Sequence, residues 1–553
     1  MASAASLLLL ALSAALPLRA APADEEVFTA MRAEMTRGMA GLRTEASGPP
    51  YFLSYRLTRE KTAMLEAAFG SMTREIHDEF GTIYIEARVG DRSLDNTDLS
   101  YHGWHGEAPG DARVLRQELW VLTDRAYRSA LAGFLEKKAR RATEFVPEAL
   151  DDFSVEASTE HAEASSRIED LDPFRGEIER LSAVFSDYPF VYDSQVSAQL
   201  DWSRRYLLTS EGARLAAPAE YVPGLLRLMA ATRALDGMRL DVQKVWGFQT
   251  TAGFPQEELI RREARSLAEG LGKLRQAPVQ APAAAPAILD PEFTGVLFHE
   301  ALGHKLEGQR QRDPRQSQVF KDSVGSRIIP EFLSLVDDPT LSFFQETPLA
   351  GHYEFDSEGV AAQRVVLVEN GVLKNFLMSR WPIKGFSRSN GHGRADAYRH
   401  PSGRMANLIV SASRTVSRST LKQRLLELTR KAGKPYGFLL TGSRGGENPN
   451  TRDSAQTLEV TPKWVYRVDA KTGEETLVRG VKMVGTPLVV LNRIVAAADD
   501  AAVGVGFVCG AESGSVPVSQ IAPSVLVSEV ELQRLPEDRL LPPIMPSPYH
   551  EKN

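Results

Sequence analysis

The sequence contains one cysteine, Cys509, in 553 residues, so no disulfide bond can form within the chain. This thiol is therefore a buried apolar group, an intermolecular partner or a metal ligand. The chain also lacks a long basic block, and its net charge is −7. Nucleic acid is disfavoured as the main partner, because phosphate binding needs clustered basic side chains. The first half has no glycine-rich nucleotide-binding loop.

Long apolar runs are absent as well, apart from Leu7 to Leu16 near the N-terminus. That run is too short to span a bilayer comfortably, and small residues and then acidic residues follow it. The pattern predicts a secretory signal peptide over residues 1–23, cleaved between Ala20 and Ala23. We therefore expect a periplasmic or secreted protein without a membrane span after cleavage. An uncleaved anchor is the alternative, because the segment before the run lacks lysine and arginine.

The length of the chain exceeds what one ordinary core holds, so at least two domains are expected. In the first half, apolar residues at helical spacing predict helices at 25–43, 124–141 and 262–275. Alternating apolar residues predict strands at 49–60 and from residue 82 onward. The first half is therefore mixed α and β.

The segment 276–291 is rich in proline and alanine, and its prolines favour an extended conformation over a flexible linker. Beyond it short β-type runs dominate, and Asn370-Gly371 and Thr472-Gly473 predict hairpin turns. The sequence predicts an α+β protein. Its expected parts are an N-terminal α/β domain at 24–275 and a sheet-rich C-terminal domain at 276–545 that carries a metal-binding helix.

That helix contains the stretch VLFHEALGH, in which His299 and His304 are five residues apart. In zinc peptidases the two histidines of H-E-x-x-H are four apart, so that one helical face presents both to the metal. Residues five apart diverge by about 140° around a regular α-helix. Both imidazoles reach one ion only if the helix is kinked or widened to a π-type turn between them. Gly303, which tolerates unusual dihedrals, lies at that point.

A catalytic zinc site commonly uses three protein ligands plus a water, so two histidines leave one ligand missing. Glu307, one turn beyond His304, and Cys509, about two hundred residues away among glycines, are the two candidates. Glu300 is adjacent to the first histidine. That position suits a carboxylate that takes a proton from a water and returns it to a leaving amine.

The flanking sequence carries a further signal. GVLFHEALGHKLEG, with CGAESGSVPV downstream, resembles the TldD/PmbA family, specifically its zinc-bearing TldD-like members. The intervening blocks YEFDSEGVAAQRVVLVENGVLKNFLMSR and SNGHGRADAYRHPSGRMANLIV match that family in the same order. The resemblance covers nearly all of residues 276–530, and a looser likeness extends through much of the first half.

The resemblance implies a zinc-dependent peptidase with His299, His304 and Cys509 as Zn²⁺ ligands and Glu300 as the catalytic carboxylate. It implies small or unfolded peptides as substrates and assembly as a homodimer or as a heterodimer with a PmbA/TldE-like chain. Two other classes of function compete with this prediction. One is a non-catalytic assembly subunit with a structural zinc, and the other is a module that binds peptides without cutting them.

Some positions depart from the family pattern or allow two interpretations. The usual glycine-rich segment is replaced at 442–457, so peptide contacts there are not transferred. His392 interrupts the expected G-N-G-R pattern, and it is interpreted either as a residue near the site or as a plain loop histidine. Arg394, Arg404 and Asn407 are candidates for binding substrate backbone or carboxylate, with structural loop contacts as the alternative.

Overall fold

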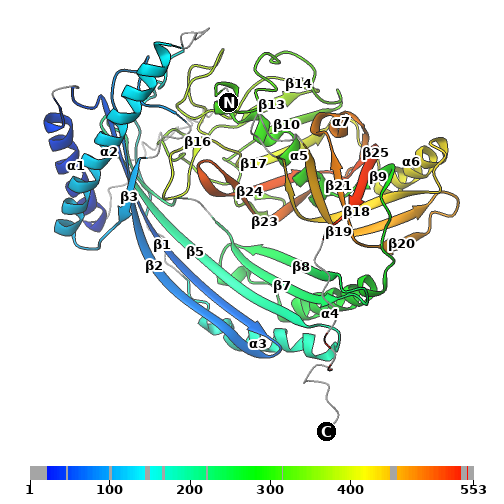
Figure 1. Ribbon diagram of the computed structural model, residues 1–553. Coiled ribbons are helices and arrows are strands. Elements are labelled where there is room, and N and C mark those ends of the chain that lie inside the picture. The colour runs from blue at the N-terminus through cyan, green and yellow to red at the C-terminus, as the bar shows by residue number, and fades with distance from the viewer. Residues whose placement is uncertain are drawn as a thin grey trace, which may run out of the picture.

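The computed structural model contains both helices and extensive sheets, which confirms the predicted α+β class (Figure 1). It describes residues 22–44, 48–98, 103–143, 150–164, 169–219, 222–313, 315–448, 457–536, 543 and 545. Residues 1–21 of the predicted signal peptide (1–23) lie outside the described residues. The first described helix begins at Pro22. None of the described helices combines the length and the apolar character needed to cross a membrane.

The α-helices occur in both halves of the chain. Their bounds are α1 Pro22–Gly41, α2 Ala112–Arg141, α3 Arg175–Ala183, α4 Glu257–Gln276, α5 Pro291–Ala301, α6 Arg418–Lys431 and α7 Pro487–Asn492. Short 3-10 helices are η1 Asp172–Phe174, η2 Val184–Asp187, η3 Thr251–Gly253, η4 Gly303–Leu306 and η5 Gly308–Gln311. The helices predicted at 25–43, 124–141 and 262–275 therefore correspond to α1, α2 and α4.

The first half folds around one eight-stranded sheet with the order β3-β2-β1-β5-β6-β4, to which β7 and β8 are added beside β5. Its strands are β1 Phe52–Ala68, β2 Ser71–Arg88, β3 Trp104–Glu107, β4 Glu160–Ala162, β5 Asp193–Thr209, β6 Arg214–Ala217, β7 Gly224–Arg233 and β8 Arg239–Phe248. A two-residue turn joins β1 to β2, with φ of 49° at Phe69 and 87° at Gly70. Positive φ at both turn residues matches the right-handed twist of the paired strands.

The strands β1, β2 and β5 are long and curved, and helices cover both of their ends (Figure 1). At one end α1 and α2 pack on β1 and β2 around Phe28, Tyr55 and Leu119. At the other end α3 and α4 pack on β1, β7 and β8 around Ile178 and Leu271. The N-terminal sheet thus carries two separate hydrophobic cores along its length.

The second half contains a six-stranded sheet of order β14-β13-β10-β17-β24-β23 and a seven-stranded sheet. The six strands are β10 Leu333–Asp337, β13 Val365–Glu369, β14 Val372–Leu373, β17 Asn407–Ala412, β23 Ala502–Ala511 and β24 Gly514–Ala522. Two small hairpins add β11 Phe343–Phe344 with β12 Thr347–Pro348 and β15 Gly393–Arg394 with β16 Ser402–Gly403. The predicted turn at Asn370-Gly371 joins β13 to β14, with φ of 48° and 80° at its two residues.

In the seven-stranded sheet five strands close on themselves, because β18 pairs with β9 and β19, while β25 and β21 complete the circle. We call these five strands the closed ring. The seven strands are β9 Ala283–Leu289, β18 Tyr436–Glu447, β19 Leu458–Asp469, β20 Glu475–Val478, β21 Val481–Gly485, β22 Ile494–Ala497 and β25 Val525–Arg534. The proline-rich segment after α4 therefore supplies a buried strand, as its extended character predicts. The predicted domain boundaries themselves stay a prediction.

The helix α5 packs against strands of both C-terminal sheets, chiefly β18 of the closed ring and β24 of the six-stranded sheet. Phe293, Leu297 and Phe298 of this helix are completely buried in the largest hydrophobic core. This packing fixes the end of α5 between the two sheets, where the histidine motif lies.

Candidate metal centre

The α-helix that carries His299 ends before it reaches His304. Asp290 caps the first turn of α5 by accepting a hydrogen bond from the Phe293 N–H at 2.9 Å, and Pro291 occupies the first helical position. The helix ends at Ala301, Leu302 adopts φ of −129°, and the tighter turn η4 follows. The five-residue spacing is accommodated by this break rather than by a π-type turn.

Gly303 is required for close packing. It is not among the glycines with positive φ, so the prediction that its backbone freedom creates the distortion is wrong. A Cβ at this position would lie 2.1 Å from Met405 Sδ, far inside the contact distance of the two atoms. A side chain at this position would require the buried Met405 side chain to move.

The break brings three possible metal ligands together. His299, His304 and Cys509 are 5%, 6% and 2% exposed, and their ligand atoms lie within 4.8 Å of one another. Cys509 Sγ lies 3.4 Å from His304 Nε2. The two imidazole rings stand at 87° with centroids 4.8 Å apart. Cys509 comes from β23, so its hairpin with β24 packs against α5 and brings the thiol to the histidines.

Glu307, the alternative third ligand, is directed to the far side of His304. Its Oε1 lies 2.9 Å from His304 Nδ1, while Nε2 of the same ring faces Cys509. A carboxylate in this position fixes the orientation and the tautomer of the ring. The geometry therefore makes Glu307 an outer partner of His304, and leaves Cys509 as the third residue of the group.

Two arginines tie the Cys509 hairpin to the His304 segment. Arg310 donates to Glu307 Oε2 through Nε at 2.7 Å, and its Nη2 lies 3.0 Å from Glu512 Oε2 on the turn of the hairpin. Arg404 donates to the Cys509 carbonyl at 2.6 Å and to the Gly514 carbonyl at 2.9 Å. These contacts bridge two segments that are about 200 residues apart in the chain.

His299 has an outer partner as well. Gln520 Nε2 on β24 lies 3.1 Å from His299 Nδ1. A metal-bound imidazole carries its proton on the ring nitrogen that does not bind the metal. Nδ1–H of a zinc-bound His299 would therefore donate to the Gln520 amide oxygen, with the two ends of that amide exchanged. No motif in the sequence indicates Gln520, because its contact depends on the pairing of β24 with β17 and on the packing of α5.

The electrostatics of the group favour an anionic sulfur. Burial opposes ionisation, but the imidazoles of His299 and His304 hold the pKa of Cys509 well below its usual value. Burial also opposes charge on His304, yet Glu307 and the Cys509 sulfur raise its pKa to about 10. Despite burial, Arg310 and His304 lower the pKa of Glu307 to about 2. The group therefore places a thiol with a lowered pKa against an imidazole with a raised pKa, where the three ligand atoms converge.

Glu300 lies beside the group without joining it. Burial raises the pKa of its carboxyl above the usual value, and the nearby imidazoles oppose that shift. Asn448 donates to the Glu300 main-chain carbonyl at 2.8 Å, and a Cβ on Gly446 would lie 2.8 Å from Glu300 Cγ. Among the described residues the carboxylate itself has no hydrogen-bond partner, so it is available to a water or a substrate.

The other predicted residues are buried and hold the protein together. Arg394 donates to the Pro517 carbonyl at 2.8 Å, and Asn407 donates to the Asp338 and Leu341 carbonyls at 3.0 and 2.9 Å. Arg404 alone lies next to the metal group, on the Cys509 hairpin. The substrate-binding role of these three residues stays a prediction.

His392 lies away from the candidate ligands. It is completely buried, its Nε2 is 3.2 Å from Asp337 Oδ1, and its Nδ1 is 3.1 Å from the Asn390 carbonyl. Asp337 also accepts from the Ala406 N–H. His392 therefore holds its loop onto β10, which supports the structural interpretation of this histidine.

The chemistry of the donor set fits zinc. Two imidazoles and a thiolate are ligands that Zn²⁺ prefers, and three protein ligands leave a fourth position for a water or a substrate. The lowered pKa of Cys509 supplies the thiolate that such a site requires. His304 and His299 would be held by Glu307 and Gln520, as outer partners hold the ligands in zinc sites generally.

Comparison with known proteins identifies the second half of the chain. Residues 282–534 match the family model described as the PmbA/TldA metallopeptidase C-terminal domain. Residues 282–534, a little less than half of the chain, therefore carry the C-terminal domain of this family. The matched region includes all three candidate ligands and Glu300.

Several curated members of the PmbA/TldD family are similar to this chain. A metalloprotease of Methanocaldococcus jannaschii is 29% identical over 325 residues, 57% of this chain and 64% of that protein. A zinc metalloprotease TldD homolog of Saccharolobus solfataricus is 28% identical over 249 residues, 45% of this chain and 51% of that protein. The chain thus spans less than two thirds of the length of these relatives.

Solved structures share the fold along most of the chain. TldE from Thermococcus kodakarensis superimposes with a TM-score of 0.62 at 14% identity, covering 91% of this chain and all of that one. A putative modulator of DNA gyrase from Thermotoga maritima gives a TM-score of 0.61 at 16% identity, with 91% and 100% covered. At these identities the likeness concerns the fold alone.

We predict that Cys509→Ser lowers zinc affinity by more than the roughly 10–100-fold that loss of an outer partner causes. A serine hydroxyl seldom ionises near neutral pH and is a poorer ligand than a thiolate. Zinc per chain is measured after dialysis against a mild chelator that leaves the wild type loaded. Zinc should also protect Cys509 from alkylation, and chelation should remove that protection. Full zinc occupancy in the serine variant would exclude the thiol as a ligand.

We predict that Glu307→Ala lowers zinc affinity about 10–100-fold, because His304 loses the partner that orients it. Glu307→Gln should lose less, since an amide oxygen still accepts from Nδ1. Glu86→Gln is the matched control, because it removes a buried carboxylate that pairs with Arg88 outside the metal group. Zinc titration with a competing chelator measures all three. Equal affinity in folded Glu307→Ala and wild type would contradict an orienting role.

Proposed function

We propose that this protein is an exported zinc-dependent metallopeptidase of the PmbA/TldD family that hydrolyses small or unfolded peptides. The observation that carries the proposal is the convergence of His299, His304 and Cys509, with the carboxylate of Glu300 adjacent. Relatives similar to the second half are named metalloproteases, and one of them is named a zinc metalloprotease. The named relatives and the donor set support the same chemistry.

Each residue has a defined task in the proposed reaction. Zinc bound by the three ligands supplies Lewis acidity, which makes a water a competent nucleophile near neutral pH. Glu300 accepts a proton from the attacking water and donates it to the departing amine, and its raised pKa suits both steps. Glu307 and Gln520 hold the two imidazoles in orientation through Nδ1. Peptide-bond cleavage then yields one new carboxylate and one new amine.

Export is part of the proposal. Residues 1–23 carry the apolar run and the small residues expected of a signal peptide, so we assign the mature protein to the periplasm or to secretion. A single thiol suits an oxidising compartment, because no internal disulfide can form in error.

Assembly with a second chain is also proposed. The fold is that of TldE from Thermococcus kodakarensis over most of the chain. We therefore propose a dimer, formed by two copies or with a TldE-like partner. Sedimentation of the purified chain alone distinguishes the two, because a heterodimer predicts a monomer without its partner.

We predict that Glu300→Gln lowers peptide hydrolysis by at least about a hundredfold, because the amide neither accepts nor delivers the proton. Zinc content should remain close to that of wild type, since the carboxylate lies beside the ligands. Glu258→Gln, on the exposed side of α4, is the matched control. Cleavage is followed by mass spectrometry on an unstructured peptide mixture. Activity within a few-fold of wild type would remove Glu300 from the mechanism.

We predict that flexible peptides are cleaved and folded proteins are resistant. The ligands are only 2–6% exposed, so a chain must enter the interior before it reaches them. A small disulfide-bonded protein is offered in native form and in reduced, alkylated form, which keeps the sequence constant. Only the unfolded form should be digested. Equal digestion of both forms would contradict a restricted site.

A further inference from the structure

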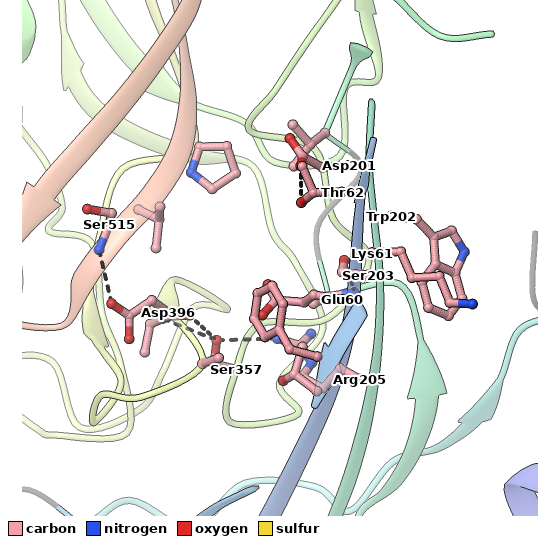
Figure 2. Close-up of a pocket in the computed structure, with 18 of the residues that line it drawn as sticks. Glu60, Lys61, Thr62, Asp201, Trp202, Ser203, Arg205, Ser357, Asp396 and Ser515 are labelled. Atoms are coloured by element: carbon pink, nitrogen blue, oxygen red, sulfur yellow. Dashed lines mark hydrogen bonds between the residues drawn. The ribbon is translucent and has the colours of Figure 1, made fainter. Parts of the chain in front are cut away.

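A cavity of about 280 Å³ lies between the two halves of the protein (Figure 2). One wall is formed by β1 and β5 of the N-terminal sheet. The opposite wall is formed by the β23–β24 hairpin. Two loops, one with Ser357 before β13 and one with Asp396 after β15, also line the cavity. The candidate zinc ligands do not line this cavity.

The cavity nevertheless adjoins the metal group through one strand. Val508 and Cys509 are consecutive residues of β23, and successive side chains of a strand point to opposite faces. Cys509 is buried against His304, whereas Val508 is 66% exposed and lines the cavity. The metal group and the cavity therefore lie on opposite faces of β23.

Three carboxylates line the cavity, and of these Asp396 interacts electrostatically with the Arg56 guanidinium. Among the described residues no ion pair is formed by Glu60, Asp201 or Asp396. Asp201 accepts only from neutral donors, Thr62 Oγ1 at 2.8 Å and Gln199 Nε2 at 2.7 Å. Burial raises the pKa of Glu60, and the neighbouring Asp201 and Asp396 raise it further. A cation in the cavity would relieve this repulsion.

The basic residues of the lining are occupied elsewhere. Arg56 donates to the main-chain carbonyls of Asp396 and Arg399 at 2.8 and 2.7 Å. Arg205 donates to the Phe355 carbonyl at 2.7 Å. Lys61 pairs with Glu79 on β2 at 2.7 Å. Arg56 and Arg205 thus hold the loops that contain Asp396 and Phe355 against the N-terminal sheet.

The remaining lining is apolar. Val516 and Pro517 of β24 form part of the hairpin wall. Phe80 of β2, which is 43% exposed, is the cross-strand partner of Glu60. Aliphatic stems of long basic side chains pack against such surfaces while their charged ends seek a polar partner. A lysine or arginine side chain matches both parts of this cavity.

We propose that this cavity is a subsite for a lysine or arginine side chain of the peptide. The aliphatic stem packs between Phe80 and Val508, and the charged end lies at Glu60 and Asp201. The inference rests on the proposed function for the statement that the ligand is a peptide. It adds a preference for a basic residue in the peptide, bound on the other face of β23 from the metal group.

The test measures binding in the presence of a chelator, so that it does not depend on hydrolysis. The probes are fluorescent, N-acetylated, unstructured decapeptides with lysine, norleucine or glutamate at one central position. A norleucine peptide with a free amino terminus is a fourth probe. Fluorescence anisotropy gives each Kd. We expect the lysine peptide to bind about tenfold more tightly than its norleucine twin, as a hydrogen bond to a charged group predicts.

Glu60→Gln should abolish this tenfold preference, and Asp201→Asn should weaken it. Glu75→Gln, on β2 outside the cavity lining, should retain it. Circular dichroism checks the fold, and the two cavity variants test the proposal independently if one of them unfolds. Retained lysine preference in both folded cavity variants would overturn the subsite.

Equal affinity for the three acetylated peptides, or no binding of any of them, overturns the proposal whatever the peptidase activity. Tight binding of the norleucine peptide only when its terminus is free would assign the cavity to an amino terminus instead. A lysine preference that Glu60→Gln removes, in a protein that cleaves nothing, would retain the subsite and refute the proposed peptidase function. The two failures are therefore distinguishable.

Discussion

The contact between the Cys509 sulfur and the His304 imidazole imposes a condition that the surrounding structure meets. Charges that leave water must be balanced by close partners, because burial alone would neutralise them. The negative charge of Glu307 lies at Nδ1 of His304, on the side of the ring away from Cys509. The positive charge of Arg310 lies in turn at Glu307. Arg310 also reaches Glu512, on the hairpin that supplies the sulfur. Opposite charges thus alternate from the sulfur to Glu512, and removing Glu307 would leave His304 without its charged partner.

The fold must also direct two histidines five residues apart toward the same point. The α-helix must end between them, and the chain must turn tightly in a space that Met405 already occupies. Gly303 allows the tight turn beside Met405 because it has no side chain. The unusual spacing of the motif and the glycine inside it are thus consequences of one arrangement.

Local features of this fold are predictable from the sequence, and long-range ones are not. The Asn370-Gly371 turn and α4 follow from dihedral preferences and helical spacing, which depend on a few neighbouring residues. His299 and His304 were identified in the same way. The role of Gly303 was predicted wrongly, because the constraint comes from Met405, about a hundred residues away. No sequence pattern indicates the contact of Gln520 with His299, because the two residues meet only when the sheet is complete.

The resemblance of short blocks to a known family supplied what spacing could not. Spacing left Glu307 and Cys509 open as third ligands, because both are chemically suitable. The structure separates them by position: Glu307 faces Nδ1 of His304, and Cys509 faces Nε2 of the same ring.

The closed ring also has a consequence for how the protein is made. Its first strand, β9, pairs with β25, the last strand of the fold, and about 240 residues separate them. During synthesis β9 leaves the ribosome long before its partner exists, so the ring cannot close and its apolar strands stay incompletely covered. If the chain is exported, this exposed interval would coincide with passage across the membrane. A chaperone that holds unfinished chains would then be most useful to this protein until the residues of β25 have emerged.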